Sequence, residues 1–173
     1  MKARFLLLPV ASLAIVSPVH AKVFLSVEQA QALMFPGATF TADYRNLTDQ
    51  QAGAIEAASG ANVLNRALKA WRVSTGGWFI ADEVVGKHEY IPIALAIDEH
   101  GAVKSVEILE YREAYGGEVR NPQWRAQFTG KKNGDAMVDG DSIQNISGAT
   151  LSSKHITDGI RRLLATYAIV LAH

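Results

Sequence analysis

The chain has 173 residues, with 17 basic and 17 acidic side chains and no cysteine. The lack of cysteine excludes disulfides, thiolate metal sites, iron–sulfur clusters and haem attached through cysteine. The balanced charge offers no basic excess for nucleic acid, so we expect no nucleic-acid partner. A redox role would therefore need a cofactor that is held in some other way.

The N-terminal segment, residues 1–21, has the layout of a secretory signal peptide. Lys2 and Arg4 precede an apolar run that is shorter than the roughly 20 residues of a membrane-spanning helix, and small residues follow at Val19–Ala21. We therefore predict export to the periplasm, and an uncleaved membrane anchor is the less favoured alternative. Residues 22–173 then form the mature chain, which has a net charge of about −2 and is long enough for one domain with a full core.

Two helices are predicted near the start of this mature chain. The capping-box pattern, in which Ser or Thr is followed three residues later by Gln, begins at Ser26 and again at Thr48. We expect the first helix to end at about Phe35, before a Pro-Gly pair, and the second to run to Gly60.

Three strands are predicted next, at residues 78–85, 90–97 and 102–111, because these segments are rich in β-branched and aromatic residues. Residues 98–101 separate the last two strands. They read as a tight hairpin turn in which Gly101 takes a positive φ angle.

A short helix at residues 124–128, a surface loop at 130–141 and a closing helix from Ser153 to the C-terminus complete the chain. Lys154, Arg161 and Arg162 are expected to lie mostly off the apolar face of this closing helix. Apolar residues repeat along it at intervals of three and four: Ile156, Ile160, Leu163, Leu164, Tyr167 and Leu171. The whole order favours an α+β fold with a mainly antiparallel twisted sheet packed with helices.

The segment before the closing helix carries the most suggestive chemistry. Small residues leave the Thr150 hydroxyl accessible, and Ser152 or Ser153 can cap the helix that follows. A helix N-terminus has unpaired N–H groups and a partial positive charge, so it stabilises a phosphate placed there. A phosphate ester on Thr150 would lie where the helix favours it.

This segment resembles the signature of the FMN-binding domain family, which occurs in the G subunit of Rnf-type complexes and the C subunit of sodium-pumping NADH:quinone oxidoreductases. The resemblance covers about residues 78–171, and it implies covalent FMN joined through its phosphate to Thr150 by a magnesium-dependent FAD:protein FMN transferase. The motif and its flank consist of Ser147, Gly148, Ala149, Thr150, Leu151 and Ser152.

The resemblance further implies a loop that covers the isoalloxazine ring and contains Glu113, Ala114, Gly116 and Gly117. The two glycines would permit close backbone approach to the ring. Ala114 stands where the family commonly has Thr, and Gln144 stands where it usually has Asp.

Other polar and aromatic residues are given structural interpretations. The histidines show no pair at metal-ligand spacing, and the acidic residues at 135–141 lack the spacing of a calcium loop, so we expect no metal site. His155, in the first turn of the closing helix, could approach the phosphate or face solvent. Trp78 and Trp124 are expected in the core rather than against a flavin.

The functional prediction is an exported flavoprotein that passes electrons from a membrane or periplasmic donor to an acceptor, without catalytic residues of its own. One alternative is an FMN-dependent reductase of small molecules or quinones. The other is a non-redox exported binding module in which Thr150 is unmodified.

Overall fold

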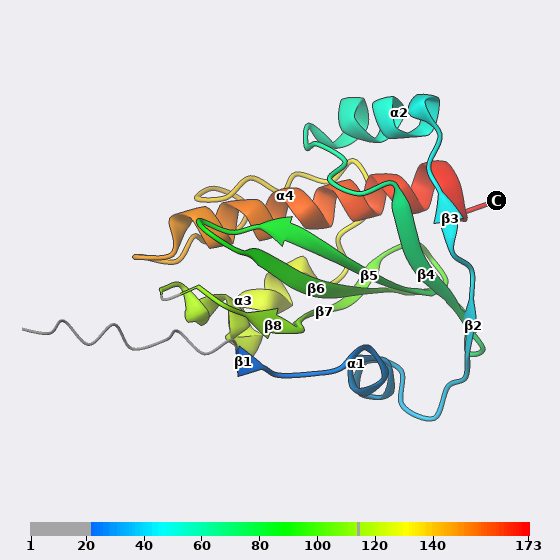
Figure 1. Cartoon of the computed structure of the whole chain (residues 1–173), viewed down its shortest axis with the longest axis horizontal. Coiled ribbons are helices and arrows are strands. Elements are labelled where there is room, and N and C mark those ends of the chain that lie inside the picture. The colour runs from blue at the N-terminus through cyan, green and yellow to red at the C-terminus, as the bar shows by residue number, and fades with distance from the viewer. Residues whose placement is uncertain (1–21, 114) are drawn as a thin grey trace, which may run out of the picture.

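The computed structural model describes residues 22–113 and 115–173 (Figure 1). The predicted signal peptide and Ala114 lie outside the described residues. The elements are β1 (Lys22–Val23), α1 (Val27–Met34), β2 (Phe40–Ala42), β3 (Arg45–Asn46), α2 (Asp49–Ser59), β4 (Ala67–Val73), β5 (Trp78–Val85), β6 (Tyr90–Ile97), β7 (Val103–Ile108), β8 (Glu110–Tyr111), the 3₁₀ helix η1 (Gly117–Arg120), α3 (Pro122–Arg125), the 3₁₀ helix η2 (Ala126–Phe128), α4 (Thr150–Thr166) and the π-helical turn η3 (Tyr167–Leu171).

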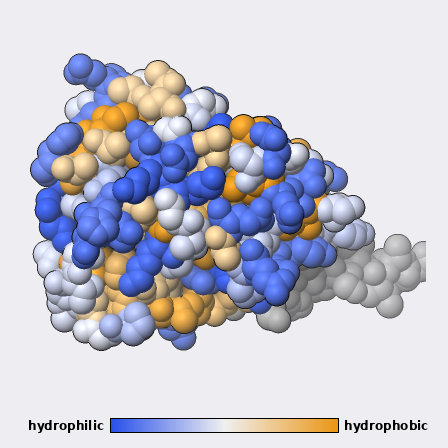
Figure 2. All heavy atoms as spheres, turned by 180° about the vertical axis from the view of Figure 1, so that it is seen from behind, coloured by the Kyte–Doolittle hydropathy of each residue, from blue (hydrophilic) through white to orange (hydrophobic). Residues whose placement is uncertain are grey.

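The fold is α+β, as predicted, and is built around an antiparallel sheet. Its strand order is β2-β4-β5-β6-β7, and β3 pairs with another part of β4. The sheet lies between α1 on one face and α4 on the other, and α2 packs on the outer side of α4 (Figure 1). Figure 2 shows the molecule from behind, where hydrophilic residues cover most of the surface and apolar residues form patches along the lower edge and near the top.

The two faces of the sheet bury separate groups of apolar side chains. The larger group fills the space between the sheet and α4, and it includes Ile80, Ile93 and Leu95 from the central strands. The smaller group lies on the α1 face and is rich in aromatic residues such as Phe79. Because neighbouring residues of a strand point to opposite faces, Phe79 and Ile80 belong to different groups.

Both predicted N-terminal helices are confirmed, with complete capping boxes. The Ser26 side chain accepts the amide of Gln29 in α1, and the Thr48 side chain accepts the amide of Gln51 in α2. The α2 helix ends at Gly60, which takes the left-handed conformation with φ 68°. These boundaries depend on contacts within one turn of helix, so the local sequence specifies them.

The central hairpins also agree with the prediction, although the strand pattern is incomplete. Strands β5 and β6 have the predicted bounds, and Gly101 in the following turn has φ 76°. The single strand predicted at residues 102–111 is instead two strands, β7 and β8, and β8 pairs with β1 rather than with the main sheet. The central strand β4 was not predicted, and its place between β2 and β5 is a long-range feature.

The closing helix α4 differs from the prediction in its start. It begins at Thr150 rather than Ser153. The predicted apolar face is buried against the sheet, apart from Tyr167, which is half-buried. Arg162, expected mostly off that face, is only 5% exposed, because it lies between β5, where it contacts Asp82 and Glu83, and the connection after α2, which supplies the Asn62 carbonyl.

Asp43 is expected to make the stability of the fold depend on acid pH. A hydrogen bond from Arg45 is the main cause that lowers the pKa of Asp43 to about 2, with a further hydrogen bond from Arg72, while burial opposes the shift. Since the pKa of Asp43 is depressed in the folded state, its ionised carboxylate adds to the free energy of unfolding above the ordinary pKa of 3.8. This stabilisation is lost as the pH falls toward about 2. The urea midpoint should therefore fall less between pH 5 and pH 2 for Asp43→Asn than for the wild type. A fall of the same size in both proteins would contradict this role of Asp43.

Candidate functional site

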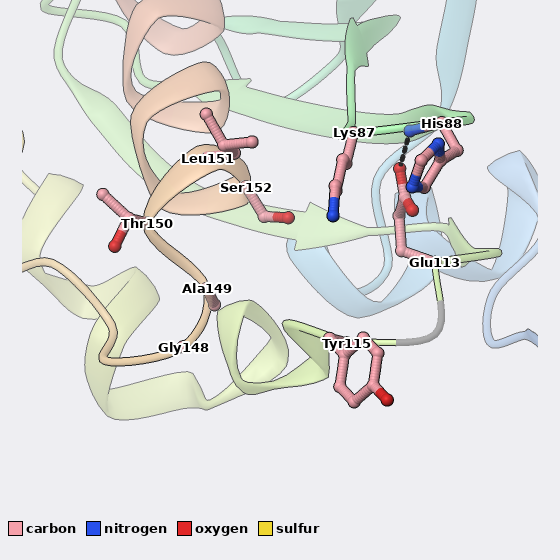
Figure 3. A pocket seen from close by; sticks show the side chains of 9 residues that line it. All are labelled: Lys87, His88, Glu113, Tyr115, Gly148, Ala149, Thr150, Leu151 and Ser152. Carbon is pink, nitrogen blue, oxygen red and sulfur yellow. Dashed lines mark hydrogen bonds between the residues drawn. The ribbon is translucent and has the colours of Figure 1, made fainter.

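A surface pocket of about 430 Å³ lies where three distant parts of the chain meet (Figure 3). These parts are the start of α4, the turn between β5 and β6, and the loop that follows β8. The pocket is lined by Lys87, His88, Glu113, Tyr115, Gly148, Ala149, Thr150, Leu151 and Ser152. The motif predicted from sequence and the predicted Glu113 loop therefore share one cavity.

The motif residues form a sharp entry into α4. Gly148 has φ 81°, which a side chain would disfavour, and Ala149 is the N-cap residue of the helix. The first intrahelical hydrogen bond runs from the Ser153 amide to the Ala149 carbonyl, at 3.0 Å. The amides of the first three helical residues, 150–152, have no acceptor among the described residues. This end of α4 is therefore an open set of N–H donors at the positive end of the helix dipole.

Thr150, the first residue of α4, is exposed, and its hydroxyl makes no hydrogen bond within the described residues. In Figure 3 its side chain points away from Lys87 and His88 on the opposite wall. The hydroxyl is thus accessible from outside and lies beside the unpaired amides.

The prediction that Ser152 or Ser153 caps the helix is wrong. The helix starts at Thr150, so both serines lie inside its first turn and their side chains bond elsewhere. The Ser152 hydroxyl lies 3.0 Å from the Tyr111 hydroxyl, and the Ser153 hydroxyl donates to Asp139. These bonds tie the start of α4 to β8 and to the 130–141 loop, and they leave the helix end itself uncapped.

Glu113 lies on the pocket wall, where it holds the neighbouring turn. Its Oε1 atom accepts the amides of His88 at 2.6 Å and Glu89 at 3.0 Å. Burial raises the pKa of the Glu113 carboxyl, but hydrogen bonds from the amides of His88, Glu89 and Lys87 outweigh burial and bring this pKa below its usual value. Gly86 makes the contact possible, because a Cβ atom there would lie 2.4 Å from the same oxygen.

The predicted glycines of the loop lie beside the pocket lining rather than in it. Gly116 has φ 92°, and a Cβ atom on it would lie 2.4 Å from the Tyr111 hydroxyl and 3.1 Å from both Ala149 Cβ and Ser152 Oγ. A Cβ atom on Gly117 would have no neighbour within 4 Å. Gly116 thus provides the close packing between the loop and the start of α4.

Gly116→Ala is therefore expected to destabilise the fold by about 1–3 kcal/mol, since alanine is strained at this φ and its methyl group would clash with Tyr111. Gly117→Ala is the matched control, because its φ is not positive and its Cβ position is open. Urea denaturation should show a lower midpoint for the first variant and an almost unchanged midpoint for the second. Equal midpoints would contradict the packing role of Gly116.

Ser147 faces a different surface from the rest of the motif. It lines a separate depression of about 480 Å³, together with Gln144 and Trp124. The Trp124 indole donates to the Gln144 carbonyl at 2.6 Å, which fixes the approach to the motif. Ser147 is thus close to Thr150 in sequence but outside the lining of the pocket.

Sequence analysis missed three residues of the pocket lining, namely Lys87, His88 and Tyr115. Lys87 and His88 come from the turn between β5 and β6, about sixty residues before the motif. Tyr115, which is 83% exposed, lies two residues after Glu113 and was predicted only as part of a Gly-rich loop. The local sequence around Lys87 and His88 carries no signal of a site, because the packing of α4 on the end of β5 brings this turn to the helix start.

The core positions predicted for two tryptophans are confirmed. Trp78 and Trp124 are both buried in the core, at 7% and 6% exposure. His155 Nδ1 lies 2.6 Å from the Val85 carbonyl, so this histidine contacts the end of β5. Within residues 22–113 and 115–173, no group of three or more potential metal ligands is found. No helix in this same part of the chain has both the length and the hydropathy of a membrane span.

The pocket fits a phosphorylated cofactor of flavin size. Its volume lies within the range of small-molecule sites, about 300–1,000 Å³. The unpaired amides of residues 150–152 supply hydrogen-bond donors for a phosphate, and Thr150 supplies a free hydroxyl beside them. Leu151 and Tyr115 add exposed apolar surface at the rim, at 48% and 83% exposure.

Comparison with known protein families agrees with this geometry. No curated protein matches the chain significantly. Residues 86–165 match the family model of the FMN-binding domain, and this range contains the whole pocket lining and both loops that close it. The protein is therefore a flavin-binding protein with FMN as its cofactor, and its residues 86–165 belong to the FMN-binding domain family.

Proposed function

We propose that the protein is an exported flavoprotein that carries FMN in a phosphoester with Thr150 and serves as an electron carrier outside the cytoplasm. The observation that carries the proposal is the exposed, unbonded hydroxyl of Thr150 at the first residue of α4, beside three amides without acceptors. A phosphate bonded to this hydroxyl would accept those amides and would lie at the positive end of the helix dipole.

Attachment requires a second protein to reach Thr150. In the proposed transfer, the Thr150 oxygen forms a bond to the FMN phosphorus of FAD, the bond between the two FAD phosphates breaks, AMP leaves and the hydroxyl proton is released. Thr150 suits this reaction because it is exposed where the pocket opens to the surface. The linkage also keeps a small cofactor on a protein that works outside the cytoplasm.

The size of the pocket favours a carrier over a reductase. Bound FMN supplies the transfer of one or two electrons, and the protein holds and orients it. A volume of about 430 Å³ is toward the low end for small-molecule sites, and a bound flavin ring would occupy much of it. Tyr115 and Leu151 are exposed at the rim of the pocket, so the site is open to a partner protein that exchanges electrons.

Intact mass measurement tests the covalent linkage. The full chain is expressed with its N-terminal segment, together with an FAD:protein FMN transferase and magnesium, and it is recovered from the periplasmic fraction. We expect a chain that lacks residues 1–21 and is heavier by about 440 Da, the mass that one FMN phosphoester adds. Peptide mapping should place the added mass on Thr150. A protein of unmodified mass would overturn the proposal and favour the non-redox binding module.

Electron-transfer kinetics separate the carrier from the reductase. The loaded protein, reduced with dithionite, should exchange electrons with a second redox protein in a single turnover. Steady-state reduction of quinones or small oxidised molecules should stay close to that of free FMN. A saturable, much faster turnover of one of these small molecules would favour the reductase instead.

A further inference from the structure

The pocket wall opposite α4 presents a lysine that the family motif does not include. Lys87 belongs to the turn between β5 and β6, and its ammonium group has no acceptor within the described residues. In Figure 3 the Ser152 hydroxyl points toward the end of the Lys87 side chain on the other side of the pocket. A lysine without a partner on the wall of a cofactor pocket is positioned to interact with a negative group of the ligand.

Glu113 holds this turn in place. Its Oε1 atom accepts the His88 and Glu89 amides, and the turn is closed by a hydrogen bond from the Gly86 amide to the Glu89 carbonyl, at 2.8 Å. The carboxylate is ionised at neutral pH, since its pKa lies below the usual value. Glu113 therefore uses its oxygen on the backbone of the turn, and the Lys87 ammonium remains available to the pocket.

In a loaded protein, the part of FMN that would face Lys87 is the flavin ring rather than the phosphate. The Thr150 side chain points away from Lys87 (Figure 3), so a phosphate bonded to Thr150 begins on the far side of the helix start. The ring, at the other end of the ribityl chain, is the part of FMN that can enter the space between Lys87 and Ser152.

We propose that Lys87 interacts with the isoalloxazine ring and raises its reduction potential, and that Glu113 acts as a positioning residue for Lys87. This inference rests on the proposed attachment of FMN at Thr150. Uptake of two electrons from a donor and one proton from water leaves one negative charge on the ring. A nearby ammonium stabilises that charge more than it stabilises the oxidised ring, and it therefore favours reduction.

The test compares Lys87→Gln with Lys154→Gln in the flavin-loaded protein. Both substitutions remove one positive charge, but Lys154 is an exposed residue of α4 that pairs with Asp158 and does not line the pocket. The reduction potential is measured by equilibration with a redox dye, after intact mass has confirmed the flavin on each variant. Lys87→Gln should lower the ratio of reduced to oxidised flavin about tenfold at a fixed potential, which is about 30 mV for a two-electron couple. Lys154→Gln should change the ratio by less than about twofold.

The positioning role of Glu113 is tested with two variants that both remove its charge. Glu113→Gln keeps a carbonyl oxygen that can accept the turn amides, whereas Glu113→Ala removes the acceptor. We expect a lower reduction potential for Glu113→Ala than for Glu113→Gln. In the Lys87→Gln background this difference should disappear, because the turn then has no ammonium to position.

The outcomes separate this inference from the proposed function. Loaded protein in which Lys87→Gln and Lys154→Gln have equal potentials overturns the role of Lys87 and leaves the covalent linkage intact. A difference between the two Glu113 variants that persists without Lys87 overturns the positioning role of Glu113. A wild-type protein without added mass overturns both the proposed function and the inference.

Discussion

Thr150→Val should abolish the covalent flavin completely, because only a side-chain hydroxyl can form the phosphoester. Valine has nearly the shape of threonine, and position 150 is exposed at the first residue of α4, so the fold should be unaffected. The measurement is intact mass and flavin absorbance after denaturation, on protein made with the transferase. We expect the unmodified mass and a colourless denatured protein. Flavin that stays attached through denaturation would contradict Thr150 as the linkage site.

Two further variants control for the loss. Thr150→Ser retains a hydroxyl at the same place and should keep some attachment. Thr129→Val makes the same chemical change at another exposed threonine, whose backbone lies in a loop after η2, and should leave the added mass unchanged. Loss of flavin from Thr129→Val as well would mean that the transfer depends on something other than the Thr150 hydroxyl.

Arg162→Ala should lower the free energy of unfolding by about 3–5 kcal/mol, the cost of removing one partner of a buried ion pair. Arg162 is 5% exposed, and it bonds to the Asp82 carboxylate at 2.8 Å, the Glu83 carbonyl at 2.8 Å and the Asn62 carbonyl at 2.9 Å. Its loss leaves these three acceptors without their donor in a largely buried place. Urea denaturation should show a lower midpoint with an unchanged slope.

Arg161→Ala is the matched control for this prediction. Arg161 is the adjacent arginine in α4, and it pairs with Asp158 one turn earlier on the same helix. Such a local pair near the surface contributes less than about 1 kcal/mol. Replacing the buried pair by Arg162→Met together with Asp82→Leu should recover much of the stability, because no charge is then left unpaired. Equal effects of Arg161→Ala and Arg162→Ala would contradict the buried role of Arg162.

Arg161 and Arg162 show what the apolar repeat of a helix cannot predict, namely the burial of residues outside the apolar face. The apolar repeat in α4 correctly identifies the face that packs against the sheet. It cannot show that α2 and the segment after it cover the other side of the helix, because that packing joins residues about one hundred positions apart, as in the bond from Arg162 to Asn62. The repeat therefore predicted only that Arg162 lies mostly off the apolar face, and its burial became apparent in the fold.

In the candidate site, too, local features could be predicted from the sequence and long-range contacts could not. The hydroxyl of Thr150 and the start of a helix beside it are adjacent in the sequence, so the motif and the closing helix could be predicted together. The caps at Ser152 and Ser153 were mispredicted because hydroxyls there have distant partners, Tyr111 and Asp139, which compete with the local helix end. Short-range geometry thus placed the Thr150 hydroxyl at the helix start but not the side-chain contacts around it.

The local features follow from the sequence alone: the capping boxes of α1 and α2, the hairpin turn at Gly101, and a Thr hydroxyl at the entrance to a closing helix. Each of these depends on contacts within a few residues of the chain. The groups that face that hydroxyl and its cavity depend instead on long-range packing. Lys87, Glu113 and Ser152 are far apart in the chain, and they share one pocket because α4 packs on the end of β5, beside the turn between β5 and β6.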